Sequence, residues 1–279
     1  MVMHLPLPPY DSVQLVRDVV AERAAGVNAA FFNGIEDQWV ARVQAYVDNA
    51  GTPSDVPSWP QIQVRSNTFL NLYLSPADGS AQGDILVEMR DHELSICPSC
   101  GELGRPNTLD HYLPKAAYPH LCITPANLFP MCDACQRAKG SKVGDAVSPR
   151  FFLHPYYDVF VAAQVLRLEI AAPFDAPSFA LQVADDLTKA QADLVRVHLR
   201  ELEIPPRFAI FFRGHHRRLL RLVSKMRSSG QNVFATLSIF QHGVADASLN
   251  SWEHVFYSSV LGNPALLDYL ANSNLPDYL

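Results

Sequence analysis

Three short segments between residues 97 and 140 decide the fold: Cys97-Pro-Ser-Cys100-Gly101, Leu109-Asp-His-Tyr-Leu-Pro-Lys115 and Asn127-Leu-Phe-Pro-Met-Cys132-Asp-Ala-Cys135-Gln-Arg-Ala-Lys139-Gly140. The first and third segments each carry a C-x-x-C pair, and the second places an aspartate directly before a histidine. Such pairs supply two thiolates from one tight turn, which favours a metal site over disulfides in an intracellular chain. The fold of this region is therefore expected to depend on a metal ion.

The four paired cysteines match the ligand set of a structural zinc ion. Zn²⁺ prefers four soft ligands in a tetrahedron, and a closed Cys₄ set leaves no position open for chemistry. We therefore predict structural Zn²⁺ at Cys97, Cys100, Cys132 and Cys135. The alternative is that one or both pairs are reduced thiols of the core. The fifth cysteine, Cys122, is expected to be a buried apolar residue.

The composition is that of a folded protein. The chain has 279 residues, of which 48% are hydrophobic and 18% charged, and this excludes a disordered chain. The apolar run Val159–Val165 is far shorter than the roughly 20 residues of a membrane helix. The first residues lack a basic segment followed by an apolar one, so no secretory signal is expected. We expect a soluble, cytoplasmic protein.

Charge is unevenly distributed along a chain whose formal net charge is −6. Residues 1–95 are strongly acidic, whereas 207–227 contains seven arginines and lysines and no acidic residue. This basic stretch, with Arg217 and Arg218 at its centre, suits contact with a nucleic-acid backbone. Its apolar residues make an ordinary bundle helix an equally good interpretation.

Periodicity predicts an α+β protein: a mostly helical chain around a central zinc-stabilised core. We expect an acidic helical region at 1–95, the core at 96–158, and a hairpin with further helices at 159–279. The helices are expected near 12–21, 38–47, 85–94, 186–202, 207–226, 251–261 and 264–271, and the hairpin strands near 159–168 and 178–183.

The segment between the two cysteine pairs contains the candidate catalytic side chains. Asp110 and His111 are neighbours, although consecutive side chains of a regular strand point to opposite faces. The strand is therefore expected to bulge or end there, next to Pro114. A short helix is expected to begin near Asp133 as its cap and to stop at Gly140. The alternative leaves Asp110 as a turn residue and His111 as a packed or surface histidine.

The segments follow one another as a C-x-x-C pair, a strand with Asp-His, an asparagine and a second C-x-x-C pair at the start of a helix. This order resembles that of the HNH endonucleases, which are also called ββα-metal nucleases. The resemblance implies a ββα-metal core in which His111 is the general base and Asp110 binds a divalent ion, Mg²⁺ or Mn²⁺. It also implies that Asn127 orients His111 by a hydrogen bond. A neutral imidazole held in one tautomer can take a proton from water near pH 7.

One position departs from the family's pattern. The family usually places His or Asn directly after the last cysteine as the second metal ligand, and here that residue is Gln136. Its carbonyl is a hard donor but one methylene longer, so the ion would sit differently. Either activity survives with weaker metal binding or the site is inactive. Lys139 and Lys115 are expected to contact a phosphate.

The segment Leu153-His154-Pro155 is similar to one that follows the core in a subset of HNH proteins, including those of bacterial anti-phage modules such as Septu, where an ATPase is the partner. His154 is then a phosphate contact or, equally, a structural histidine. The resemblance implies a DNA-cutting hydrolase acting in antiviral defence, with flanking helices that dock an ATPase, another regulatory protein or a second copy. The alternatives are a non-catalytic, zinc-stabilised nucleic-acid-binding or assembly protein, and a nuclease acting on RNA.

Overall fold

A computed structural model describes residues 3–276 and divides the chain into two compact units. Unit 1 contains Ser95–Gly104 and the described part of 159–279, and unit 2 contains His4–Leu94 and Arg105–Asp158. This division differs from the three consecutive regions expected from the sequence, because the first cysteine pair groups with the C-terminal residues.

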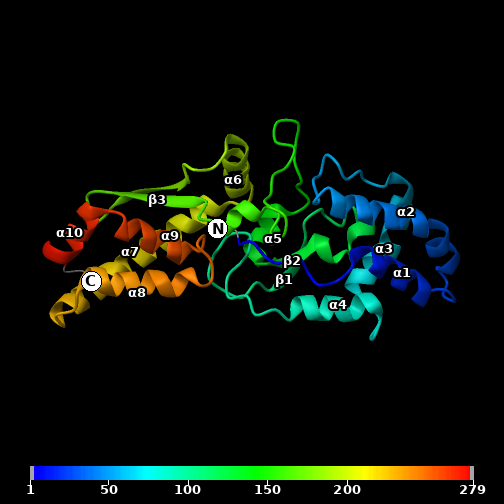
Figure 1. The fold of residues 1–279 in the computed structure, drawn as a ribbon, viewed down its shortest axis with the longest axis horizontal. Coiled ribbons are helices and arrows are strands. Elements are labelled where there is room, and N and C mark those ends of the chain that lie inside the picture. Colours follow the sequence, from blue (N-terminus) through cyan, green and yellow to red (C-terminus); the bar gives the residue numbers. More distant parts are fainter. Residues whose placement is uncertain (1–2, 277–279) are drawn as a thin grey trace. The chain divides into compact units, whose positions relative to one another are not determined.

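Unit 2 begins with four helices, α1 (Ser12–Glu22), α2 (Ala29–Asp48), α3 (Ser66–Leu74) and α4 (Ala81–Arg90). Helix α1 starts as expected, since the Asp11 carboxylate accepts hydrogen bonds from the backbone N–H groups of Val13 and Gln14. Helix α1 packs on α2, and α3 packs on α4 (Figure 1).

An aromatic cluster forms the core of these helices. The Trp39 ring lies edge-on to that of Phe69 with centroids 5.0 Å apart and stacks on Phe32 at 5.7 Å. All three side chains are buried, and Trp39 Nε1 donates a 2.7 Å hydrogen bond to the carbonyl of His120. This bond fixes the segment that follows the Asp-His strand against α2.

A small hairpin and a short helix complete unit 2. Strand β1 (Thr108–His111) pairs antiparallel with β2 (Leu128–Met131), with Asp110 opposite Phe129. Helix α5 (Asp133–Lys139) follows β2 and packs on β1 (Figure 1). Strand β1 ends at His111, as expected. The N-cap of α5 is Cys132 rather than Asp133, and the helix ends at Gly140 with φ = 51°, a conformation that glycine adopts without strain.

The described part of unit 1 contains a second hairpin and five α-helices. Strands β3 (Leu166–Ala171) and β4 (Ser178–Val183) pair antiparallel, with Leu168 opposite Leu181. The helices are α6 (Lys189–Glu201), α7 (Ile204–Ser228), α8 (Val233–Ala245), α9 (Trp252–Leu261) and α10 (Pro264–Asn272). Helix α9 packs on β3 and on α8, and α7 packs on α6 and α10.

The expected mixture of helices and small sheets is confirmed, with differences in detail: α3 was not predicted, and α4 covers Ala81–Arg90 and not 85–94. Residues 159–162 form a 3₁₀ turn, so the first strand of the C-terminal hairpin begins only at Leu166. Helix α8 was not predicted, because most of its positions are apolar and no polar face reveals a helical period. Phe234 and Ile239 of α8 are 56% and 69% exposed, so apolar residues occupy the solvent-facing side of the helix as well as its buried side.

Within the described residues, the structure contains no helix with both the length and the apolar character needed to cross a bilayer.

His120 gives a prediction about acid stability. Its side chain is fully buried, neither ring nitrogen has a hydrogen-bond partner within residues 3–276, and burial lowers its pKa from 6.5 to about 3. The folded chain therefore keeps this ring neutral while the unfolded chain protonates it below about pH 6.5, so stability falls as pH drops toward 3. Between pH 6.5 and 5 we expect protonation of His120 in the unfolded chain to lower the free energy of unfolding by about 2 kcal/mol.

His120→Phe should remove this part of the pH dependence while keeping the ring contact with Trp59, at 5.5 Å. Urea unfolding of both proteins at pH 7, 6 and 5 measures it. The stability difference should shift in favour of the variant as pH falls. A difference that stays constant over this range would contradict the assigned neutral state.

Candidate metal centre and active site

The four paired cysteines converge. Their Sγ atoms all lie within 4.8 Å of one another. A tetrahedral Zn²⁺ with Zn–S bonds of about 2.3 Å holds its sulfurs about 3.8 Å apart, so this arrangement can hold a metal ion and fits structural zinc. No disulfide joins any of them, and Cys97, Cys100 and Cys135 are buried.

Backbone and side-chain hydrogen bonds shape the first pair. The N–H of Gly101 donates to the carbonyl of Cys97 at 2.8 Å, which closes the turn. Trp252 Nε1 donates to the carbonyl of Cys100 at 2.6 Å, and Arg207 Nη1 lies 3.8 Å from the Cys100 sulfur. A cation next to a sulfur favours its thiolate form, which is the form that binds metal.

The fifth cysteine lies outside this cluster. Cys122 is fully buried, and its thiol donates to the carbonyl of Phe69 at 3.1 Å. Burial raises its pKa, so this thiol stays protonated. The expected packing role is confirmed.

Asp110 lies between strand β1 and helix α5. Its Oδ1 accepts a hydrogen bond from Gln136 Nε2 at 3.2 Å, and its Oδ2 lies 3.1 Å from the ammonium of Lys139. Residue 110 is 8% exposed, and Oδ2 has no partner of good hydrogen-bond geometry even though the ion-pair distance is short. The carboxylate is therefore held mainly by charge attraction and by the Gln136 amide.

Lys139 requires a correction. It was expected to contact a phosphate, but it is only 1% exposed and its Nζ donates a 2.6 Å hydrogen bond to the backbone carbonyl of His111. The same atom forms the ion pair with Asp110. Lys139 therefore fixes the Asp110–His111 dipeptide to α5 from inside the fold. Helix α5 is short and packs on strand β1, so the side chain of Lys139 at its end turns toward that strand. The sequence alone does not show this packing.

His111 is buried but is held in one defined state. It is 2% exposed, its Nε2 lies 2.8 Å from the carbonyl of Cys122, and its ring packs edge-on to Tyr73 with centroids 4.5 Å apart. A carbonyl can only accept, so Nε2 carries the proton and Nδ1 keeps its lone pair. Burial, with the nearby charge of Lys115, lowers the His111 pKa from 6.5 to about 3. The imidazole is therefore neutral at pH 7.

Asn127 does not bond to the His111 ring, contrary to expectation. Its Oδ1 accepts from the N–H of Leu113 at 2.8 Å, and its Nδ2 donates to the carbonyls of Leu113 and Leu121. Asn127 thus braces both ends of the loop between β1 and β2. The orienting acceptor for His111 is instead the carbonyl of Cys122, a backbone group that no side-chain motif can announce.

A cavity of about 570 Å³ lies in unit 2 beside this dipeptide. Gln136, Lys115 and Tyr73 line it, and Tyr73 is also the residue that contacts His111. Sequence reasoning missed three further lining side chains that are basic or can become so: Arg90, His92 and Arg105. None of the residues that line the cavity is acidic. Arg90 and His92 are two residues apart, but Arg105 and Lys115 lie in other segments, so only the convergence of these residues in space reveals a cationic pocket.

Asp110 and Gln136 are the side chains that could bind a hard divalent cation here. Asp110 offers a carboxylate and Gln136 an amide, and rotation of that amide by 180° would turn its oxygen toward the aspartate. Mg²⁺ accepts one or two such ligands and retains several waters. The residues therefore fit a hydrated ion, with the ammonium of Lys139 as a competing positive charge on the same carboxylate.

Two further histidines are structural, and one of them is His154, which was expected to be either a phosphate contact or a structural histidine. His154 is fully buried, accepts the N–H of Tyr156 on Nδ1 and bonds to the Tyr46 hydroxyl at 2.9 Å. His216 is buried in α7 and bonds to the carbonyl of Phe174. Arg217 and Arg218 of the same helix are exposed, as a backbone-contacting role requires.

One relative was found among known proteins. A 62-residue segment is 37% identical to Protein ea31 of Escherichia phage lambda. The match covers 22% of this chain and 21% of the relative, so the chain spans about a fifth of the length of the protein it matches. No protein-family model matches the chain, and no solved structure matches it.

Proposed function

We propose that this chain is a metal-dependent HNH-type endonuclease that hydrolyses phosphodiester bonds in DNA. The observation that carries the proposal is the geometry of His111 next to Asp110: its Nε2 bonds to the Cys122 carbonyl, which fixes the tautomer and leaves the Nδ1 lone pair available to accept a proton. A general base needs a fixed tautomer of this kind. The adjacent Asp110 and the basic cavity supply the other needs of phosphate chemistry.

Each residue has a role in the proposed reaction. His111 Nδ1 takes the proton of the attacking water, and the Cys122 carbonyl steadies the imidazolium that forms. Arg90, Arg105 and Lys115 attract the phosphate backbone into the cavity. A divalent ion held through Asp110, with Gln136 beside it, would supply positive charge to a phosphate oxygen and to the leaving 3′ oxygen.

A second function has its own supporting observation. The His111 ring is 2% exposed and the Asp110 carboxylate is already paired with Lys139, which suits a site kept for its structure. The alternative is a zinc-stabilised protein that binds nucleic acid through the basic cavity or assembles with a partner, without catalysis.

Cleavage of supercoiled plasmid with Mg²⁺ or Mn²⁺ tests the proposal. The native chain should cut, and His111→Ala should lower the rate by about 10²- to 10⁴-fold, the usual contribution of a general base. His242→Ala is the matched control, because His242 is an exposed histidine of α8. It should leave the rate unchanged.

Two outcomes would count against the enzyme. If neither metal supports cutting while the chain still binds DNA in a salt-dependent way, the binding protein is correct. If His111→Ala cuts as fast as the native chain and retains its zinc, another group is the base. Single-stranded RNA of the same length, offered in parallel, decides between DNA and RNA as substrate.

The biological setting is a separate proposal. The relative is a phage protein, and the resemblance to nucleases of anti-phage modules suggests an effector that acts with an ATPase or another regulatory partner. Copurification of the tagged chain from its host, with and without infection, should recover such a partner in stoichiometric amount. Recovery of the chain alone under both conditions would contradict a stable effector complex.

A further inference from the structure

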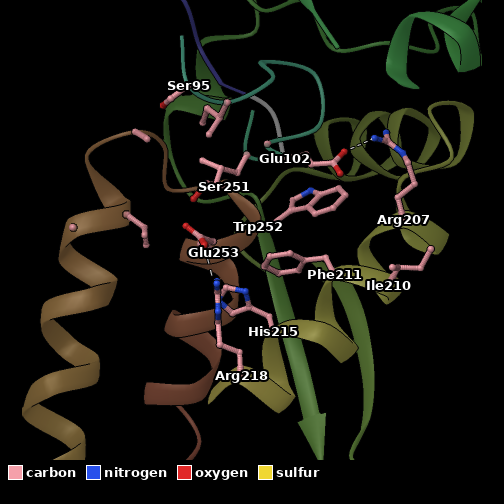
Figure 2. Close-up of a pocket in the computed structure, with 16 residues that line it drawn as sticks. Ser95, Glu102, Arg207, Ile210, Phe211, His215, Arg218, Ser251, Trp252 and Glu253 are labelled. Atoms are coloured by element: carbon pink, nitrogen blue, oxygen red, sulfur yellow. Dashed lines mark hydrogen bonds and ion pairs between the residues drawn. The ribbon is translucent and has the colours of Figure 1, made fainter. Parts of the chain in front are cut away.

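A second cavity, of about 640 Å³, lies entirely within unit 1 and takes no residue from the proposed nuclease site (Figure 2). Helix α7 lines one side, the α8–α9 connection and the start of α9 line another, and residues 95–103 close it. Its volume is within the usual range of small-molecule sites, about 300–1,000 Å³.

Helix α7 presents a single stripe to this cavity. Arg207, Phe211, His215 and Arg218 are three or four residues apart, so they share one helical face. Trp252 and Glu253, from the first turn of α9, lie opposite the aromatic part of that stripe (Figure 2). The cavity thus has an aromatic centre with polar groups at its edges.

His215 is the least satisfied polar group in this wall. It is 8% exposed, and its Nε2 has no hydrogen-bond partner among the described residues. The nearest acceptor, Glu253 Oε1, is 4.0 Å away, too far for a hydrogen bond (Figure 2). A buried polar atom without a partner is costly, so this pair is suited to a ligand that reaches both groups.

The two arginines of the stripe differ in their availability. Arg207 is paired with Glu102 at 2.7 Å and lies beside the Cys100 sulfur, so it belongs to the surroundings of the metal ligands. Arg218 is exposed at the other end of the stripe, one turn beyond His215 (Figure 2). An anionic group of a ligand would therefore meet Arg218.

We propose that this cavity binds a nucleotide. The base packs against the half-buried ring of Phe211, which the buried Trp252 supports edge-on with ring centroids 5.4 Å apart, while its amino group donates toward Glu253 and His215. The phosphate pairs with Arg218. A purely apolar occupant, such as a leucine side chain of a partner, would leave His215 and Glu253 buried and unpaired, so it fits the wall less well.

Calorimetric titration of the full chain with AMP, CMP, UMP and ribose 5-phosphate tests the proposal. AMP or CMP should bind, and UMP should bind at least about tenfold more weakly because uracil lacks an exocyclic amino group. Ribose 5-phosphate, which has no base, should not bind measurably. An oligonucleotide of adenylates is titrated in parallel. Tighter binding of AMP indicates a free nucleotide as the ligand, and tighter binding of the oligonucleotide indicates a nucleic-acid strand.

Two variants test whether the ligand binds in this cavity. Arg218→Ala and Glu253→Gln should each weaken AMP or CMP binding by about tenfold. The matched control is Arg196→Ala, because Arg196 is an exposed arginine of α6 that does not line the cavity. It should bind normally. The proposal is overturned if neither AMP nor CMP saturates the chain at millimolar concentration, or if both cavity variants bind as the native chain does.

Discussion

Replacement of Cys132 by serine is expected to unfold the chain, and removal of zinc by a chelator should do the same. The four sulfurs lie within 4.8 Å of one another, and a structural zinc ion bound by such a set contributes about 10–16 kcal/mol of apparent binding energy near pH 7. This is as large as the total stability of most domains, about 5–15 kcal/mol. Loss of one ligand should therefore abolish both the bound metal and the cooperative melting transition.

The measurements are the zinc content by elemental analysis and thermal unfolding by circular dichroism. The native chain should contain one zinc per molecule. Cys122→Ser is the control, since Cys122 is a buried cysteine outside the cluster. It should keep the zinc and melt cooperatively at a lower temperature. A Cys132→Ser protein that retained its zinc and its native transition would refute the Cys₄ assignment.

Replacement of Lys139 by methionine should cost about 3–5 kcal/mol, because it leaves the buried carboxylate of Asp110 without its countercharge. It also removes the 2.6 Å hydrogen bond to the carbonyl of His111. Burial lowers the Lys139 pKa while the attraction of Asp110 opposes that shift, so the two charges depend on each other. The free energy of unfolding in urea is the measurement.

A double-mutant cycle separates the ion pair from simple loss of packing. Asp110→Asn combined with Lys139→Met removes both charges, and the pair should recover much of the stability that Lys139→Met loses alone. The matched control is Lys189→Met, which breaks an ion pair to Asp193 whose lysine is 91% exposed. It should cost less than about 1 kcal/mol. Equal costs for the buried and exposed lysines would contradict the role assigned to Lys139.

The local features of the fold could be predicted because they depend on residues close together in the sequence. The Asp11 cap of α1, the end of β1 at His111 and the end of α5 at Gly140 each depend on a few neighbouring residues. The C-terminal hairpin also follows from alternation within its own strands. Helix α8 was missed because its apolar sequence carries no period, so only its packing on α9 identifies it.

The candidate site could be predicted only in its residue types. The motif named Asp110, His111 and Gln136, and the structure places the first and third in contact. It could not reveal that Lys139 turns inward, that Asn127 braces a loop, or that a backbone carbonyl holds His111. Such partners are chosen by distance in three dimensions, and a backbone acceptor has no sequence signal.

The sequence by itself determined which side chains this protein can use: four thiols spaced as two pairs, and one imidazole beside a carboxylate. Tertiary structure alone decided how they are used. It gathered Arg90, Arg105 and Lys115 around one cavity, and buried one lysine to hold a carboxylate in place. The reason is physical, since the cost of burying a charge and the reach of an electrostatic attraction depend on the surroundings of each group and not on its position in the chain.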